Sequence, residues 1–199
     1  MDRDTWNERY RADELVWRAE PNMFLVEEIE GMKPGRALDL ACGEGRNAVW
    51  LASRGWEVVG VDFSSAGLAK GRGMAKERGV EVEWEEADVV SWTPPRGAFD
   101  LVVVMYLQLP ADQRRVALGH AAEALAPGGV LLVVAHDVTN LTEGFGGPQN
   151  PAVLYSAEDV VGDLDGLRID RAERVERPVE TDTGTAVALD TLVRAVRPA

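Results

Sequence analysis

Short apolar runs alternate along the chain with segments of helical composition, and turn-forming residues separate the two. The apolar runs predict strands, and those at 99–104 and 130–135 are apolar on both faces, as in buried parallel strands. Strands are expected at 37–41, 56–62, 80–84, 99–104 and 130–135, and helices from Pro21-Asn22, at 45–53, from Ser64 or Ser65 to 78, at 111–126 and from Ser156. This alternation predicts an α/β fold with a parallel sheet.

The last part of the chain follows a different pattern. Two strands are expected at 169–179 and 186–196, joined by Glu180-Thr181-Asp182-Thr183-Gly184, which predicts a hairpin. A dinucleotide-binding domain would more often continue with parallel units or with a second catalytic domain. The 199 residues leave no room for that second domain, so a single domain over 1–199 is expected.

The first strand leads into a glycine turn that carries the strongest chemical signal. Gly43 and Gly45 allow positive φ and leave no Cβ between the backbone and a ligand. A helix that starts near Gly45 directs its free N–H groups toward that ligand. Asp62 ends the next strand about 20 residues after the first glycine, where a carboxylate accepts hydrogen bonds from ribose hydroxyls. Together these residues predict an adenosine-type ligand.

Asp39 separates two interpretations of this turn. The run 43–48 also fits the G-x-G-x-x-G/A pattern of nicotinamide enzymes, a weak signal by itself. Asp39 lies in the strand before the turn, where its carboxylate would attract a positive group and repel a diphosphate. S-adenosylmethionine carries an ammonium and a sulfonium, so the sequence favours that cofactor, with S-adenosylhomocysteine as its product.

The same stretch resembles a known family. Its run Asp39-Leu40-Ala41-Cys42-Gly43-Glu44-Gly45 is similar to the first motif of class I S-adenosylmethionine-dependent methyltransferases, and Arg46-Asn47 extends the resemblance to the tellurite-resistance and thiopurine methyltransferase-like branch. The resemblance implies a Rossmann-like, seven-stranded, mostly parallel sheet with helices on both faces and a C-terminal antiparallel hairpin. It also implies cofactor contacts at Asp39, Ala41, Gly43, Gly45, Arg46, Asn47, Asp62, Phe63, Asp88, Val89 and Met105.

Some of these residues have a structural alternative. By the resemblance, Asp88 receives the adenine amino group and Met105 lines the cofactor, but an aspartate at such a place also serves as a turn or N-cap residue. Arg46 and Asn47 would lie in the first turn of a helix, which can place them on the surface. Cys42 is interpreted as a small residue packed beside the turn rather than as a nucleophile.

The acceptor side is less defined. Trp6 and Tyr10 share one helical face, so residues 1–20 either anchor a helix to the core or form a lid over cofactor and substrate. The long loop 138–155 is a second candidate for a substrate lid. Tyr106 and His136 follow buried strands at their carboxyl ends, where open α/β sheets bind ligands. Tyr106 faces either substrate or core, and His136 contacts substrate or acts as a base unless it only makes a structural hydrogen bond.

Methyl transfer needs alignment in a dry pocket, because the donor already carries an activated leaving group. A thiolate or another soft anion needs no catalytic residue, whereas an oxygen or nitrogen acceptor often needs a base, for which His136 and Asp137 are the candidates. The resemblance suggests a sulfur, selenium or tellurium nucleophile. The alternatives are an NAD-dependent oxidoreductase and a non-catalytic protein that binds S-adenosylmethionine.

The composition of the chain limits the classes of partner that are expected. A net charge of −13 would repel a nucleic-acid backbone, so a small-molecule acceptor is expected and no nucleic acid. Cys42 is the single cysteine, and no Cys/His spacing suggests a metal site. No stretch approaches the roughly 20 apolar residues of a membrane span, and the polar N-terminus is unlike a signal peptide. A cytoplasmic protein with no membrane contact is therefore expected, and the oligomeric state is not predicted.

Overall fold

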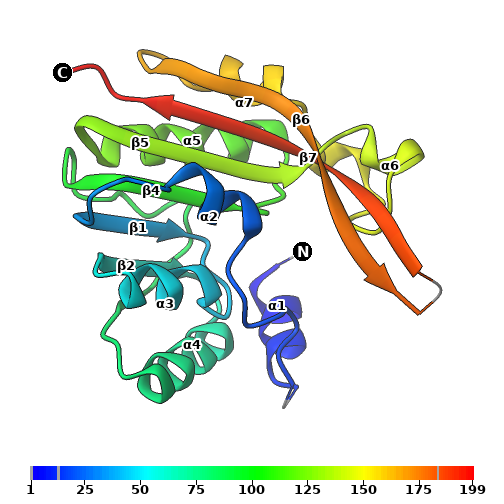
Figure 1. Cartoon of the computed structure of the whole chain (residues 1–199), viewed down its shortest axis with the longest axis horizontal. Helices are drawn as coiled ribbons and strands as arrows, with labels where there is room; N and C mark the ends of the chain where they lie inside the picture. The colour runs from blue at the N-terminus through cyan, green and yellow to red at the C-terminus, as the bar shows by residue number, and fades with distance from the viewer. Residues whose placement is uncertain (1, 13, 183) are drawn as a thin grey trace.

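The computed structural model describes residues 2–12, 14–182 and 184–199, and a seven-stranded sheet runs through its centre (Figure 1). The strands are β1 (Arg36–Leu40), β2 (Glu57–Asp62), β3 (Glu83–Glu86), β4 (Phe99–Met105), β5 (Leu125–His136), β6 (Arg168–Thr181) and β7 (Gly184–Val196). Their order is β3-β2-β1-β4-β5-β7-β6; β1 to β5 are parallel, and β7 is antiparallel to β5 and β6. The expected mostly parallel sheet with a C-terminal antiparallel hairpin is confirmed.

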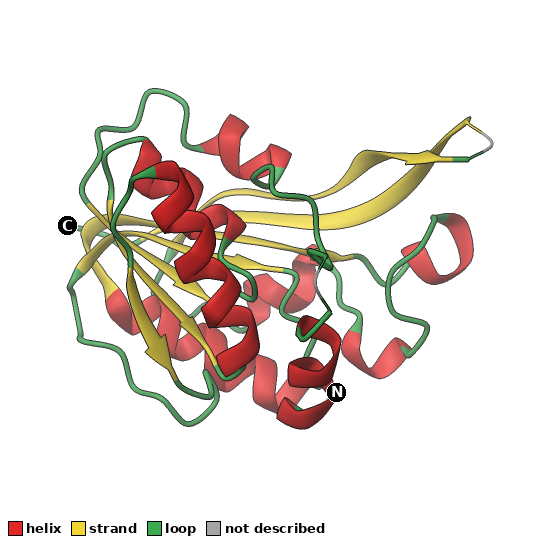
Figure 2. Ribbon diagram, turned by 90° about the horizontal axis from the view of Figure 1, so that it is seen from below, coloured by secondary structure: helices red, strands yellow, loops and turns green. Residues whose placement is uncertain are grey.

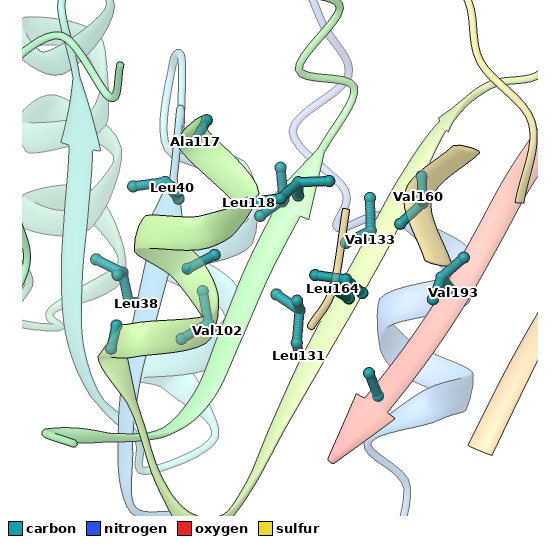
Figure 3. Packing of buried hydrophobic residues seen from close by; sticks show 14 of the residues in the cluster. Leu38, Leu40, Val102, Ala117, Leu118, Leu131, Val133, Val160, Leu164 and Val193 are labelled. Atoms are coloured by element: carbon teal, nitrogen blue, oxygen red, sulfur yellow. The ribbon is translucent and has the colours of Figure 1, made fainter. Parts of the chain in front are cut away.

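Helices cover both faces of this sheet. They are α1 (Arg3–Tyr10), α2 (Met23–Glu28), α3 (Arg46–Ser53), α4 (Ser65–Arg78), α5 (Ala111–Ala124), α6 (Asn140–Glu143), α7 (Ala157–Gly162) and the 3-10 turn η1 (Pro151–Val153). On one face, α5 and α7 pack Leu118 and Val160 against Val133 of β5 (Figure 3). On the other face, Leu51 of α3 shares a cluster with Leu132, the neighbour of Val133. Successive residues of β5 thus serve opposite cores, which explains its continuous apolar run.

The predicted helix starts are confirmed by their caps. Asn22 accepts hydrogen bonds from the backbone of Phe24 and Leu25, and Ser64 accepts one from Gly67. Ser156 forms a reciprocal capping box at the start of α7. Each cap satisfies N–H groups that the first helical turn leaves free, so the polar side chain fixes the first residue of its helix.

Two expected strand starts were wrong, and the expected long loop contains short helical segments. The edge strand begins at Glu83 and not at residue 80, because the N–H of Val80 closes the end of α4 by donating to Ala75 O. Strand β5 begins at Leu125, and the pairing of Phe99 with Leu125 and of Leu101 with Val130 leaves the Pro-Gly-Gly turn as a bulge inside the strand. The loop 138–155 contains α6 and η1.

The two strands of the β6–β7 hairpin are longer than the other strands of the sheet. They have 14 and 13 residues and extend beyond the other strands (Figure 2). Along β5, the register pairs His136 with Asp190 of β7, and Asp190 in turn faces Val175 of β6. The hairpin therefore brings charged residues from late in the sequence to the carboxyl end of β5.

Trp84, on edge strand β3, lies against three glycines from three different segments. A Cβ built on Gly45, Gly60 or Gly71 would come within 2.4, 2.9 and 2.6 Å of its ring. The ring thus fills the space beside the loop that opens α3, which gives Gly71 a packing reason inside a helix where glycine costs stability. Gly73, in the same helix, has nothing within 4 Å of that position.

Alanine at the two helical glycines is expected to have opposite effects. Gly71→Ala displaces Trp84 and should lower the free energy of unfolding by about 1 to 3 kcal/mol. Gly73→Ala adds a methyl group in open space and should raise it by about 0.5 to 1 kcal/mol. Urea unfolding of both variants measures the difference, and equal effects would contradict the packing reason for Gly71.

Candidate active site

The glycine turn after β1 has the left-handed geometry that its sequence predicts. Gly43 and Gly45 have φ of 57° and 78°, and Ala41, just after the strand, has φ of 63°. Gly45 is the N-cap of α3 and has no capping side chain, so the first N–H groups of α3 stay directed toward the turn. The absence of a Cβ atom also leaves room for a neighbouring side chain, because a Cβ atom on Gly43 would lie 2.8 Å from the Tyr10 hydroxyl.

Asp39 places a buried carboxylate beneath this turn. Its side chain is 1% exposed, and Oδ2 accepts a hydrogen bond of 3.0 Å from the N–H of Ala48. Oδ1 is buried and has no hydrogen-bond partner within the described residues. Burial raises the pKa of Asp39 to about 7, although the Ala48 hydrogen bond opposes the rise. A buried oxygen in this state is stabilised by a cation or a donor brought by a ligand.

Asp62, at the end of β2, holds the turn from the other side. Its Oδ2 accepts from Gly43 N and its Oδ1 from Ser64 N, both at 2.8 Å. Burial raises the pKa of Asp62 in spite of these bonds. Each carboxylate oxygen has two acceptor positions, so one per oxygen remains for a pair of hydroxyl groups. Phe63 follows half-buried at the same edge.

Asp88 and its neighbours lie beyond the end of β3. The Asp88 side chain is exposed, and Oδ1 accepts from Val90 N at 2.9 Å, which is the turn contact that the sequence left open as an alternative. Val89, three residues after β3, and Met105, the last residue of β4, are both buried at the carboxyl edge of the sheet. The structure therefore brings Asp88, Val89 and Met105 to the expected edge of the sheet, with Asp88 also serving its own turn.

Arg46 and Asn47 have different surroundings. Asn47 is buried and accepts a hydrogen bond of 2.9 Å from Asn22 N, so its side-chain oxygen joins α2 to α3 and serves the fold. The Asn47 oxygen thus has a structural role, and a cofactor contact at Asn47 stays a prediction. Arg46 is half-buried among Tyr106, Asp39 and Arg177, and burial lowers the pKa of its guanidinium. The positive charge of Arg46 therefore lies within the candidate site.

The N-terminal strap, defined as residues 2–12 and 14–20, lies over the glycine turn. The rings of Trp6 and Tyr10 stack with centroids 5.2 Å apart, and Tyr10 is 6% exposed. Trp17 donates from Nε1 to the Tyr10 hydroxyl at 3.4 Å. Asn7 accepts from Ser64 Oγ at 2.7 Å, which ties α1 to the start of α4. The strap thus places aromatic side chains beside the predicted cofactor site.

Glu44, in the glycine turn itself, fastens this strap. Its carboxylate accepts from the N–H groups of Val16 and Trp17, each at 3.1 Å, and forms an ion pair of 2.9 Å with Lys70. Glu44 is 3% exposed. A buried, charge-assisted contact of this kind links the position of the strap to that of the turn.

A second polar cluster lies at the carboxyl ends of β4 and β5. Asp190, fully buried, accepts at Oδ2 from the Tyr106 hydroxyl at 2.7 Å and from Arg177 Nε at 2.6 Å. His136 Nδ1 lies 3.2 Å from Asp190 Oδ1, and its ring packs 4.8 Å from that of Tyr106. Burial favours the neutral form of Asp190, but the contacts with His136, Arg177 and Tyr106 outweigh it and lower the pKa of that carboxyl group.

Sequence reasoning missed two of these residues. Arg177 and Asp190 lie on β6 and β7, in strands that carry many charges and show no local motif. The only signal is the strand register, which pairs His136 with Asp190 and needs the folded sheet. Tyr106 and His136 were predicted from their positions after buried strands, and the structure brings both into this cluster.

The surroundings of Asp137 and Cys42 indicate a structural role for both residues. Asp137 is buried, and its carboxylate accepts from Thr139 N, Thr139 Oγ1 and Thr191 Oγ1 at 2.9, 2.6 and 2.7 Å. These bonds occupy both oxygens, which argues against Asp137 as a base. Burial raises the pKa of the Cys42 thiol well above its usual value, so the thiol stays protonated and unreactive.

The described residues contain no group of three or more His, Cys, Asp or Glu side chains arranged for a metal ion. Within the same residues, none of the helices has the length and apolar character that a membrane crossing requires.

Sequence comparisons find similarity to methyltransferases over part of the chain. Residues 37–129 match the profile of a family described as a methyltransferase domain. Demethylmenaquinone methyltransferase of Thermus thermophilus is 41% identical over 124 residues, which make up 61% of this chain and 54% of that protein. Ribosomal RNA small subunit methyltransferase C of Alcanivorax borkumensis is 34% identical over 125 residues, 59% of this chain and 38% of that protein. The chain thus spans about half the length, or less, of these curated relatives.

Structural comparison agrees with the sequence profile. The N-methyltransferase NodS from Bradyrhizobium japonicum, solved in complex with S-adenosyl-L-homocysteine, shares the fold with a TM-score of 0.74 and 21% identity over 100% of both chains. Residues 37–129 are thus similar to a methyltransferase domain, and the chain has the fold of NodS. These similarities support the expected family, its enzyme class and its cofactor, S-adenosylmethionine. The tellurite-resistance and thiopurine branch stays a prediction.

The stability and the ligand affinity of the protein should depend on pH through Asp39. Because burial raises the pKa of the folded carboxyl to about 7, above about 4 for the unfolded chain, its stabilising contribution is complete at acid pH and is lost as the pH rises through 7. Asp39→Asn removes this loss, so the variant should melt at a higher temperature than the parent at alkaline pH. It should also bind S-adenosylhomocysteine about 10- to 100-fold more weakly, since it lacks a charge-assisted hydrogen bond.

Thermal unfolding and calorimetric titration across this pH range measure both effects. The parent's affinity should rise with pH until Asp39 is ionised, and the variant's should stay flat. Asp112→Asn, an exposed aspartate at the start of α5, is the matched control and should leave both quantities unchanged. Unchanged affinity in Asp39→Asn would remove the carboxylate from the cofactor site.

Proposed function

We propose that this chain transfers the methyl group of S-adenosylmethionine to a small-molecule acceptor, with a thiol or another soft nucleophile as the first class to examine. The observation that carries the proposal is the buried Asp39 Oδ1, which has no partner among the described residues and lies in the strand that leads into the glycine turn. A ligand with an ammonium group satisfies this oxygen, whereas a diphosphate is repelled by it.

The other residues each suit a different part of the adenosine group of the ligand. Gly43 and Gly45 let the backbone approach, the two free acceptor positions of Asp62 suit the ribose hydroxyls, and Asp88 with Val89 suits the adenine. When bound, S-adenosylmethionine supplies a methyl group already activated by a sulfonium. The protein's task is then to align the acceptor and to exclude water.

The N-terminal strap is the part of the chain best placed to exclude water. Its aromatic side chains, Trp6 and Tyr10, lie beside the glycine turn, and its anchor Glu44 belongs to that turn. A change in the turn on ligand binding is therefore transmitted to the strap through one buried carboxylate. We assign residues 1–20 the role of a lid on this basis.

The loop 138–155 closes the acceptor side. Asn140 donates from Nδ2 to Gly146 O at 2.9 Å and accepts from Leu189 N at 2.7 Å, which fastens the loop to β7. Gly147 of this loop comes so close to His136 that a Cβ on it would lie 3.1 Å from the imidazole. The loop therefore packs against His136, beside which the acceptor is expected.

The net charge of −13 supports a small acceptor over a nucleic acid, although one relative is named as a ribosomal RNA methyltransferase. A cytoplasmic location stays a prediction. A non-catalytic protein that binds S-adenosylmethionine is the second candidate, because the cofactor residues alone do not require turnover.

A methyl-transfer assay separates these two functions. The purified chain is incubated with S-adenosylmethionine carrying a labelled methyl group and with alkyl and aromatic thiols, selenols, phenols, amines and carboxylic acids. We expect labelled product and S-adenosylhomocysteine in equal amounts, first with thiols or selenols. Tight S-adenosylhomocysteine binding with no product from any class would favour the non-catalytic candidate.

Loosening the strap should speed the release of the cofactor product. Glu44→Gln removes the charge of the carboxylate that holds Val16, Trp17 and Lys70, so we expect S-adenosylhomocysteine to dissociate about tenfold faster, which corresponds to about 1.4 kcal/mol. Stopped-flow tryptophan fluorescence measures the rate. Glu77→Gln, an exposed glutamate of α4, is the control. Identical rates in both variants would leave the strap without a role as a lid.

A further inference from the structure

The side chains around Asp190 are arranged in a specific way. Methyl transfer to an acceptor that is already an anion does not require this arrangement. Asp190 is fully buried, and the Tyr106 hydroxyl and Arg177 Nε both donate to its Oδ2. These two bonds fix the carboxylate so that Oδ1 faces His136 Nδ1 at 3.2 Å. Within the described residues, Oδ1 and Nδ1 are both buried and neither has a hydrogen-bond partner, so the 3.2 Å approach to each other is their one polar contact.

The imidazole of His136 is clamped in one orientation. Its backbone N–H donates to Gln108 Oε1 at 2.9 Å, which fixes the residue at the end of β5. One face of the ring packs against Tyr106, with centroids 4.8 Å apart, and Gly147 lies so near Cγ and Nδ1 that a Cβ there would be 3.1 Å away. The ring therefore has little freedom to rotate, and its two nitrogen atoms have different surroundings.

Nδ1 faces a carboxylate, so it is the nitrogen that carries the proton. In the neutral ring, Nε2 then carries the lone pair, and no described residue hydrogen-bonds to it. Burial opposes ionisation of Asp190, but Arg177, which lies over the Tyr106 ring at 5.5 Å, and the Tyr106 hydroxyl help to lower the pKa of that carboxyl group. A carboxylate therefore faces His136 Nδ1.

We infer that His136 is the general base of this enzyme, with Asp190 as its positioning residue, and that the acceptor carries an acidic proton. This inference rests on the proposed methyl transfer. Nε2 takes the proton from the acceptor atom as that atom forms its bond to the methyl carbon. The carbon–sulfur bond breaks and its electron pair stays on sulfur. Asp190 stabilises the resulting imidazolium, which releases its proton to solvent.

The tautomer of His136 tests this inference without an acceptor. The chain has only two histidines, so nitrogen-15 labelling of histidine gives a spectrum that the Gln variants of His120 and His136 assign. At alkaline pH we expect His136 to be protonated at Nδ1 and not at Nε2. Asp190→Asn should abolish this preference, and Asp170→Asn, an aspartate of β6 paired with arginines, should preserve it. A proton on Nε2 in the parent would overturn the inference.

A pair of acceptors provides the kinetic test. An alkyl thiol is largely protonated at neutral pH, whereas a nitro-substituted aromatic thiol is already an anion and needs no base. We expect His136→Gln to lower turnover of the alkyl thiol by about 10² to 10⁴ and that of the aromatic thiolate by less than about threefold. Equal losses with both thiols would reduce His136 to a structural role.

The failure of this inference differs from the failure of the proposed function. S-adenosylhomocysteine affinity in His136→Gln and Asp190→Asn should match that of the parent, which shows that both variants are folded and that the cofactor site is intact. A parent that binds no S-adenosylhomocysteine contradicts the proposed function, whatever the tautomer. A parent that methylates thiols while His136 carries its proton on Nε2 contradicts the general base alone.

Discussion

The site depends on a carboxylate that the sheet buries without satisfying. Asp39 lies within β1, where the fold gives one of its oxygens a backbone partner and leaves the other in a dry environment. In such surroundings a charge interacts far more strongly than in water, and an unpaired charge is costly. The protein therefore holds a buried carboxylate oxygen that pairing with a cationic ligand stabilises. The left-handed turn at Gly43 and Gly45 brings the backbone close to that same position.

Two distant parts of the chain complete what the central sheet begins. The N-terminal strap reaches the glycine turn through Glu44, and the β6–β7 hairpin reaches the carboxyl end of β5 through Asp190. The strap places an aromatic side chain, Tyr10, beside the glycine turn, and the hairpin places charged side chains beside His136 and Tyr106. Proteins of one fold can differ in function through such additions to a common sheet.

The sequence predicted the features that depend on neighbouring residues. The glycine turn, the caps at Asn22 and Ser64, and the hairpin follow from local rules of turns, caps and periodicity, and all appear in the structure. Arg177 and Asp190 could not be predicted as partners of Tyr106 and His136, because the four residues come from the ends of β4 and β5 and from β6 and β7 and meet only through the register of the sheet. The packing reason for Gly71 needed the same knowledge, since Trp84 reaches it from another element. Long-range contacts leave no periodic trace in the sequence.

The account is tested most directly by calorimetric titration of the unliganded protein with S-adenosylhomocysteine, with NAD titrated in parallel. A buried carboxylate at Asp39 predicts that the protein binds S-adenosylhomocysteine and has no measurable affinity for NAD. Binding of NAD without binding of S-adenosylhomocysteine would contradict the assignment of Asp39, and with it the proposed methyl transfer.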